Sequence, residues 1–175
     1  MKTNTSLRGL VTSGLFAALI FLATYMFHIP TAHGGYIHVG DTIIYLAASI
    51  MPTPFAIPCA AIGGALSDAL SPGGAVWIIP TLLIKSVMTL FFTSKCHHII
   101  CKRNIAAIFI AGIVGLAGYY LASALMYNNF IAPLITLPLD ILQPIASGIL
   151  FVILGTALDK IKFKQSYDFS FTKRV

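Results

Sequence analysis

The sequence predicts an all-α integral membrane protein, a bundle of six transmembrane helices forming one domain over residues 1–175. Of the 175 residues 58% are hydrophobic and only 9% are charged, and the mean hydropathy is +0.91, which excludes an ordinary soluble surface. Long uncharged runs suit a hydrocarbon core of about 30 Å at about 1.5 Å per helical residue. The lysines and arginines gather between and beyond these runs. No repeat or change of composition divides the chain.

The predicted helices cover six ranges: about 9–28, 41–51, 55–70, 76–93, 105–127 and 138–158. The first is expected to be retained, because it is too long for a signal-peptide core and lacks a clear cleavage site. The second and third could form a single span, since only prolines at 52 and 54, with another at 58, interrupt the uncharged run. As a separate helix, the second would be only about 16 Å long.

The basic residues favour two separate helices there. With six spans and a cytoplasmic amino terminus, every lysine and arginine outside the spans falls on the cytoplasmic side, as the positive-inside rule requires. A single helix would instead put the basic loop at 95–103 and the basic tail on the face opposite the amino terminus. We therefore predict that both termini are cytoplasmic and that the first, third and fifth loops face outside.

The first outer loop contains GGYIHVGD at 34–41, a polar cluster between apolar runs. Such a cluster near a bilayer suggests a place where a small polar molecule is held. Asp41 at its end is expected to cap the following helix and to favour its dipole.

Lys85 lies inside the fourth predicted helix. A charge at membrane depth costs a few kcal/mol, so Lys85 should face the bundle interior and find a partner. Asp68 and Asp140 are the candidate counter-charges. A structural ion pair and a direct ligand contact both remain open.

Aromatic and polar residues gather at the outer ends of the fourth, fifth and sixth helices. An interfacial aromatic belt explains many of them, and the same residues could stack on and hydrogen-bond a flat heterocycle. These two accounts are compatible. The candidates are Trp77, Tyr119, Tyr120, Tyr127, Asn128, Asn129, Asp140 and Gln143.

No catalytic motif is present. The chain has no nucleophile and base pair, no phosphate-binding glycine loop and no zinc-protease helix, so we expect that it is not an enzyme. Three histidines in or beside the first loop match no standard metal spacing, and the basic surroundings of CHHIIC at 96–101 disfavour a cation. No metal and no cofactor are predicted, and no nucleic-acid partner.

Four stretches in register resemble a known family: SGLFAALIFLAT, GGYIHVGD, AIGGALSDALSPGG and PTLLIKSVMTL. From about Leu7 to Leu158 the chain resembles the substrate-binding S components of energy-coupling factor (ECF) vitamin transporters. It looks most like the branch associated with riboflavin, hydroxymethylpyrimidine and pyridoxine-type substrates.

The resemblance implies an ABC importer subunit of a prokaryotic plasma membrane that captures a vitamin from outside. A hydroxymethylpyrimidine or pyridoxine-like substrate is favoured, with riboflavin next. The first loop would act as a lid, with Gly34, Gly35 and Gly40 providing flexibility and Tyr36 and His38 contacting the ligand.

The resemblance also implies partners. These are a membrane T component and two cytoplasmic ATPases, so ATP hydrolysis would lie on separate chains. The family's alanine-xxx-alanine docking motif falls on Gly14 and Ala18. The alternative is a self-sufficient secondary transporter with Lys85 and the aspartates as its relay, although the chain is short, lacks glutamate and shows no inverted repeat.

Overall fold

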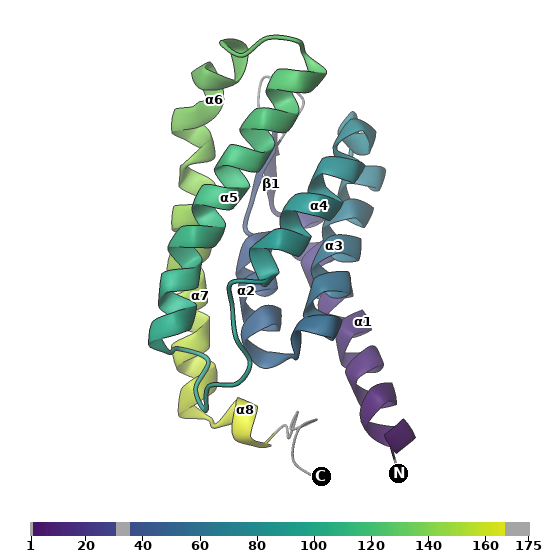
Figure 1. Cartoon of the computed structure of the whole chain (residues 1–175), viewed down its shortest axis with the longest axis vertical. Helices are drawn as coiled ribbons and strands as arrows, with labels where there is room; N and C mark the ends of the chain where they lie inside the picture. The colour runs from purple at the N-terminus through teal and green to yellow at the C-terminus, as the bar shows by residue number, and fades with distance from the viewer. Residues whose placement is uncertain (1, 31–35, 167–175) are drawn as a thin grey trace.

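The computed structural model describes the backbone of residues 2–30 and 36–166 and the side chains of residues 7–27, 29 and 38–165. Helices dominate, and two three-residue strands pair as an antiparallel hairpin (Figure 1). The elements in order are α1 (Lys2–Met26), β1 (His28–Pro30), β2 (Tyr36–His38), α2 (Gly40–Ile50), α3 (Thr53–Leu70), a 3₁₀ turn η1 (Gly74–Trp77), α4 (Ile78–Thr89), α5 (Lys102–Met126), α6 (Ala132–Asp140), α7 (Leu142–Lys160) and α8 (Phe163–Ser166).

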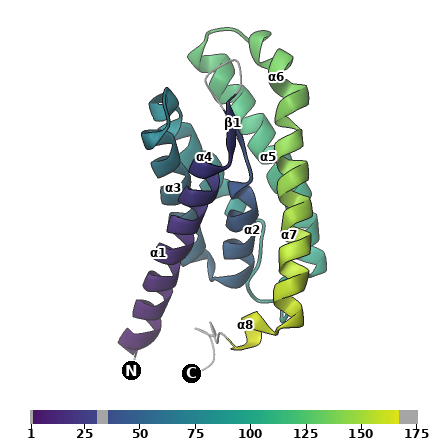
Figure 2. The same ribbon diagram turned by 180° about the vertical axis from the view of Figure 1, so that it is seen from behind.

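The helices form two groups with α2 between them. Helices α1, α3 and α4 pack in sequence on one side, while α5 contacts both α6 and α7 on the other (Figures 1 and 2). Small residues permit the close approach of α1 and α3: a Cβ on Gly63 would lie 2.7 Å from the backbone oxygen of Ala17. The hydroxyl of Ser13 donates to the carbonyl oxygen of Phe55 at 2.9 Å. Packing of this kind drives helix association where no hydrophobic force acts between helices.

Helix α2 is short because it is enclosed by protein. Ten of its eleven residues are buried, and it contacts α1, α3, α4 and α7. Tyr45 stacks on Phe92 with ring centroids 4.9 Å apart and meets Phe151 edge-on at 6.0 Å. A helix buried on all sides does not need to match the bilayer thickness. The β hairpin continues from it towards the end of the molecule where α6 lies (Figure 1).

The segment after α5 differs from the sequence prediction, which placed a loop before a helix starting at 138. The structure has α6 from Ala132 and, after a break at Ile141, α7. Asn129 explains the earlier start, because its Oδ1 accepts the backbone N–H groups of Ile131 and Ala132 at 2.8 and 3.1 Å. Pro133 in the first turn suits a helix start. The 29 residues Ala132–Lys160 extend about 44 Å, more than the hydrocarbon core.

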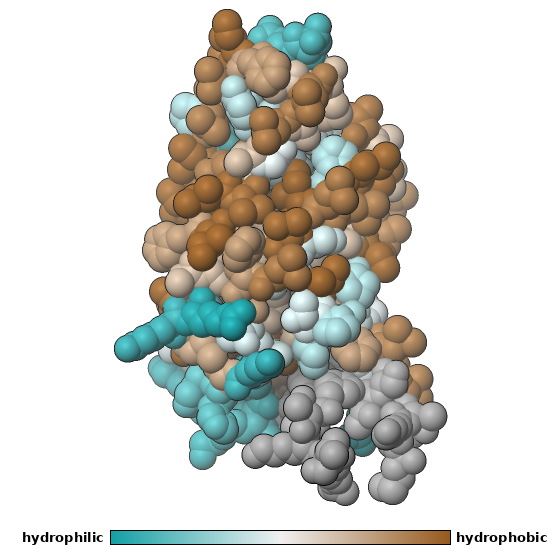
Figure 3. Space-filling view, in the orientation of Figure 1, coloured by the Kyte–Doolittle hydropathy of each residue, from teal (hydrophilic) through white to brown (hydrophobic). Residues whose placement is uncertain are grey.

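Within the described part of the chain, four segments are long and apolar enough to cross a membrane: Leu7–Met26, Thr53–Leu70, Lys102–Met126 and Ala132–Lys160. Two shorter apolar segments, Gly40–Ile50 and Gly74–Thr89, accompany them. Large apolar side chains face outwards, for example Leu83 at 65% and Phe109 at 69% exposure. Figure 3 shows an apolar band, with hydrophilic side chains gathered at the end that carries the start of α1, the start of α5 and α8.

Candidate ligand-binding site

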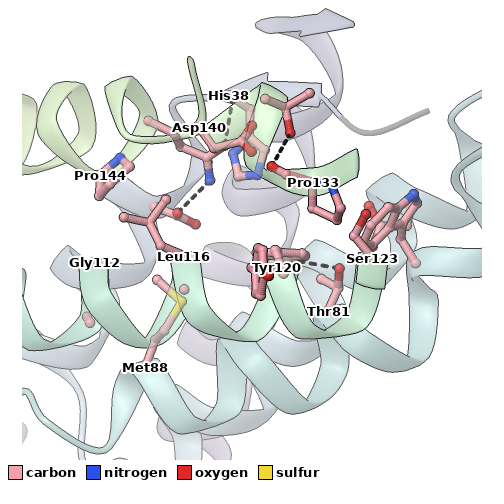
Figure 4. Close-up of a pocket in the computed structure, with 18 of the residues that line it drawn as sticks. His38, Thr81, Met88, Gly112, Leu116, Tyr120, Ser123, Pro133, Asp140 and Pro144 are labelled. Atoms are coloured by element: carbon pink, nitrogen blue, oxygen red, sulfur yellow. Dashed lines mark hydrogen bonds between the residues drawn. The ribbon is translucent and has the colours of Figure 1, made fainter. Parts of the chain in front are cut away.

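A cavity of about 110 Å³ lies between α5, the α6–α7 segment and the start of α4, near the hairpin. This is several times the roughly 10–15 Å³ that one enclosed water needs. Figure 4 shows His38, Thr81, Tyr120, Ser123 and Asp140 among the side chains around it. Its lining comprises His38, Asp41, Tyr45, Asp68, Trp77, Thr81, Met88, Ala111, Gly112, Gly115, Leu116, Tyr119, Tyr120, Ser123, Pro133, Thr136, Asp140, Gln143 and Pro144.

A buried ion pair holds one wall of the cavity. Lys85 Nζ donates to Asp41 Oδ1 at 2.6 Å, and the two side chains are only 1% and 3% exposed. Gln143 Nε2 donates to the other oxygen of Asp41 at 2.9 Å. Gln143 Oε1 also accepts the backbone N–H of His38 at 3.4 Å. These contacts connect α4, α2, α7 and the hairpin.

Aromatic side chains form a second wall. The rings of Trp77 and Tyr119 lie 6.0 Å apart between centroids, and Lys85 Nζ lies 5.1 Å from the centroid of Tyr119. The hydroxyls of Tyr119 and Thr81 share a hydrogen bond at 3.0 Å. Flat aromatic surfaces beside fixed polar groups suit a planar, polar ligand.

Two buried polar atoms on aromatic side chains of the lining have no hydrogen-bond partner among the described residues. They are Nε1 of Trp77, a residue 7% exposed, and the hydroxyl of Tyr45, a residue fully buried. A buried polar group without a partner costs about 1–3 kcal/mol. Both atoms belong to residues that line the cavity.

Six candidate ligand contacts predicted from the sequence line the cavity: His38, Trp77, Tyr119, Tyr120, Asp140 and Gln143. They come from the hairpin, η1, α5, α6 and α7, which are distant in sequence. Although distant in sequence, these residues lie around one cavity, as a shared binding site requires.

Three predicted residues do not reach the cavity. Tyr127 is 48% exposed, Asn128 adopts a positive φ of 48° just after α5, and Asn129 caps α6. All three belong to the turn between α5 and α6, so the structure assigns them to shaping that turn. Polar residues at a helix end have this alternative use.

The expectations for the two charged residues also need correction. Lys85 is absent from the lining and pairs with Asp41, whereas the sequence analysis offered Asp68 or Asp140. Asp41 lies in the first turn of α2, and its two oxygens accept hydrogen bonds from Lys85 and Gln143 and do not cap the helix start. The demand of a buried ammonium for a carboxylate outweighs the smaller gain from capping.

The predicted lid is described only in part. Gly34 and Gly35 lie outside the described residues, and Tyr36 is described only as backbone in β2, opposite Pro30. Gly40 is buried at the start of α2, where a Cβ would collide with the side chain of Thr24. The backbone N–H of Gly40 donates to His38 Nδ1 at 3.1 Å, which orients the imidazole beside the cavity.

Helix α1 carries small residues at four-residue spacing in two rows, Gly9 with Ser13 and Gly14 with Ala18, and the two rows face different directions. Gly9 and Ser13 pack against α3 through Phe55. Gly14 and Ala18 are exposed, and no atom lies within 4 Å of a Cβ built on Gly14. The second row is therefore accessible to another helix.

Sequence reasoning missed several lining residues, including Tyr45, Gly112 and Gly115. Tyr45 follows Asp41 by about one helical turn, so the two residues share a helix face, and this spacing in the sequence indicates Tyr45 as a lining residue. The glycines of α5 leave space in the wall, and only the tertiary structure reveals which face they lie on. Among the described residues, no group of three histidine, cysteine or acidic side chains is placed to hold a metal.

Residues 4–160 match the family model described as the ECF-type riboflavin transporter, S component. The chain belongs to this family. The resemblance found in the sequence is thereby confirmed, and the protein is a multi-pass membrane protein and a transporter's substrate-binding component, not an enzyme. No curated protein and no solved structure matches the chain. For an S component, a polar cavity within an apolar bundle is the expected place for the substrate.

Proposed function

We propose that this S component captures a small water-soluble vitamin from outside the cell and delivers it inward as part of an ECF-type importer. The observation that carries the proposal is the cavity in which Trp77 Nε1 and the Tyr45 hydroxyl are buried without partners among the described residues. A pocket with fixed aromatic walls and unsatisfied polar groups is suited to a ligand that supplies the missing hydrogen bonds.

The proposed orientation puts both termini in the cytoplasm of a prokaryotic cell and the cavity towards the outside, with six helices in the membrane. Its support is the distribution of charge. The basic side chains lie at the end of the bundle opposite the cavity, which is rich in hydrophilic side chains in Figure 3. Arg8, Lys102, Arg103 and Lys160 belong to helix ends there, and Lys95 belongs to the loop between α4 and α5. Positive residues favour the cytoplasmic side.

The proposed substrate is a flat nitrogen heterocycle carrying hydroxyl groups. A single-ring compound such as hydroxymethylpyrimidine or pyridoxine is favoured because about 110 Å³ is small beside the roughly 300–1,000 Å³ of common ligand clefts. Riboflavin is the second candidate, and the description of the family favours it. Trp77, Tyr119 and Tyr120 would supply the stacking surfaces, with Asp140 and Gln143 as polar contacts.

The proposed partners are a membrane T component and two cytoplasmic ATPases. The exposed row of Gly14 and Ala18 on α1 supports helix docking there. The alternative is a self-sufficient carrier with Lys85 as part of a proton relay. Against it stands the enclosure of Lys85, which is paired with Asp41 and does not itself line the cavity.

Two experiments test these proposals separately. Detergent-purified protein is titrated with pyridoxine, hydroxymethylpyrimidine and riboflavin, and saturable binding of at least one is expected. The protein is then reconstituted in vesicles with and without the T component and ATPases. Uptake that needs both the partners and ATP is expected, while uptake by this chain alone would contradict the subunit assignment.

A further inference from the structure

Two cysteines lie against each other in the loop between α4 and α5. The thiol of Cys101 donates to Cys96 Sγ, with the two sulfurs 2.6 Å apart, which is close to the roughly 2.05 Å of a disulfide bond. Both are free thiols, and both residues are partly exposed. The third cysteine, Cys59, is only 1% exposed within α3. The pair therefore combines closeness with access from solution, which Cys59 does not have.

Hydrogen bonds fix the backbone that carries the pair. Cys101 immediately precedes α5, and its carbonyl oxygen accepts the N–H of Ile105 at 2.9 Å. The side chain of Asn104 is fully buried and bonds to two points of the loop. Its Oδ1 accepts the N–H of Thr93 at 2.8 Å, and its Nδ2 donates to the carbonyl oxygens of Thr93 and Ile99 at 3.1 and 2.9 Å. These bonds hold the loop in the shape that brings the two sulfurs together.

Helix α7 holds the same loop from another side. The two carboxylate oxygens of Asp159 accept the N–H groups of Ile99 and Ile100 at 2.8 and 2.9 Å. Gly155 permits this close approach, because a Cβ there would lie 2.6 Å from Cδ1 of Ile100. The thiols are thus held in place before any reaction. Groups held in this way react at an effective concentration far above that of separate molecules.

Closeness favours oxidation of the pair more than thiolate formation does. Burial and the contact with Cys101 raise the pKa of the Cys96 thiol, and the positive charges of Lys164 and Arg103 offset this only in part. The thiolate is the reactive form, so the first oxidation step should be slow at neutral pH. Once one sulfur is oxidised, its neighbour is already in contact, and the second step is intramolecular.

We propose that Cys96 and Cys101 are a redox modification site and form a reversible disulfide when a peroxide reaches them. One sulfur attacks the O–O bond of hydrogen peroxide, which gives a sulfenic acid and releases water. The second thiol then attacks the sulfenic sulfur, the S–S bond forms, and a second water leaves. Two electrons pass from the sulfurs to the peroxide, and both thiol protons end in the waters. A small dithiol reverses the change.

The modification goes beyond the proposed function and does not depend on which vitamin is bound. In the proposed orientation the loop faces the cytoplasm, where thiols are kept reduced and disulfides are usually transient or redox-sensing. We expect the dithiol at rest and the disulfide under oxidising conditions. The disulfide also constrains the unfolded chain, so the midpoint of thermal unfolding should rise by a few degrees.

The test uses the detergent-purified full chain before and after treatment with hydrogen peroxide. Trypsin cleaves after Lys95 and Lys102, so both cysteines stay in one peptide, CHHIICK at 96–102. Free thiols are alkylated after denaturation, and the peptide is weighed by mass spectrometry. After peroxide it should carry no alkyl group and lack two hydrogen atoms. After dithiothreitol it should carry two alkyl groups.

Three results would overturn the proposal: a peptide that still takes two alkyl groups, a peptide linked to a second chain, or added oxygen atoms that dithiothreitol does not remove. Cys59→Ser is the matched control and should form the same disulfide as the unmodified chain. In Cys101→Ser the remaining Cys96 lacks its partner and should gain oxygen atoms. Loss of the disulfide in Cys59→Ser would also overturn the pairing.

Discussion

Replacing Lys85 by methionine is expected to destabilise the protein by about 3 kcal/mol. Lys85 and Asp41 lie 2.6 Å apart with side chains 1% and 3% exposed, and removing one partner of such a pair costs roughly 3–5 kcal/mol. Asp41 keeps the hydrogen bond from Gln143 at 2.9 Å, which compensates part of its charge. The lower end of the range is therefore expected. Methionine retains most of the side-chain volume, so a cavity contributes little.

The measurement is the free energy of unfolding by denaturant in detergent micelles. Leu83→Met is the matched control, because Leu83 lies on the same helix with 65% exposure, and it should change stability by less than about 0.5 kcal/mol. The double variant Lys85→Met with Asp41→Asn removes both charges and keeps an acceptor for Gln143. It should be more stable than either single variant. A Lys85→Met protein as stable as its control, or a double variant no better than the worse single one, would refute the buried pair.

Three further variants test separate parts of the molecule. Trp77→Phe keeps an aromatic ring, although a smaller one, and removes the unpartnered N–H. Calorimetric titration should show vitamin binding weakened about 3- to 10-fold, and unchanged affinity would remove Nε1 from the site. Gly14→Leu should leave binding intact and reduce ATP-dependent uptake to background. Ala106→Leu, which also adds a branched apolar side chain but on the exposed face of α5, should transport normally. Transport by both proteins would contradict docking through α1. Asp159→Ala should lower the free energy of unfolding by about 2 kcal/mol, because the carboxylate of Asp159 accepts two backbone N–H groups of the α4–α5 loop. A larger effect on vitamin affinity than on stability would contradict this structural role.

The membrane class and the family could be predicted because both depend on patterns along the chain. Apolar runs of the required length and the separation of basic residues are properties of sequence. The predicted second helix is too short to span the hydrocarbon core, and burial of α2 on nearly all sides explains why it does not need to. The early start of α6 could not be predicted, because Pro138 is the more obvious helix-start signal in the sequence. In the structure, Asn129 instead accepts backbone N–H groups at the start of α6.

The partner of Lys85 could not be chosen from the sequence. Asp41, Asp68 and Asp140 are all at the outer ends of predicted helices, and hydropathy does not reveal which of them faces α4. The choice depends on how far α2 enters the bundle. It enters deeply enough for Asp41 to reach Lys85, and Asp68 and Asp140 line the cavity. For the same reason, position near a helix end alone could not separate Asp140 and Gln143, which line the cavity, from Tyr127 and Asn128, which do not.

The most direct test of the account is the fluorescence of Trp77, the only tryptophan of the chain. Because this side chain lines the cavity, its emission should report occupancy without any label. Titration of the purified protein with pyridoxine or hydroxymethylpyrimidine, and the loss of riboflavin's own emission for that ligand, should give saturable changes with one equivalent bound. Emission unaffected by every vitamin tested, with no binding by calorimetry, would contradict the claim that this cavity is the substrate site.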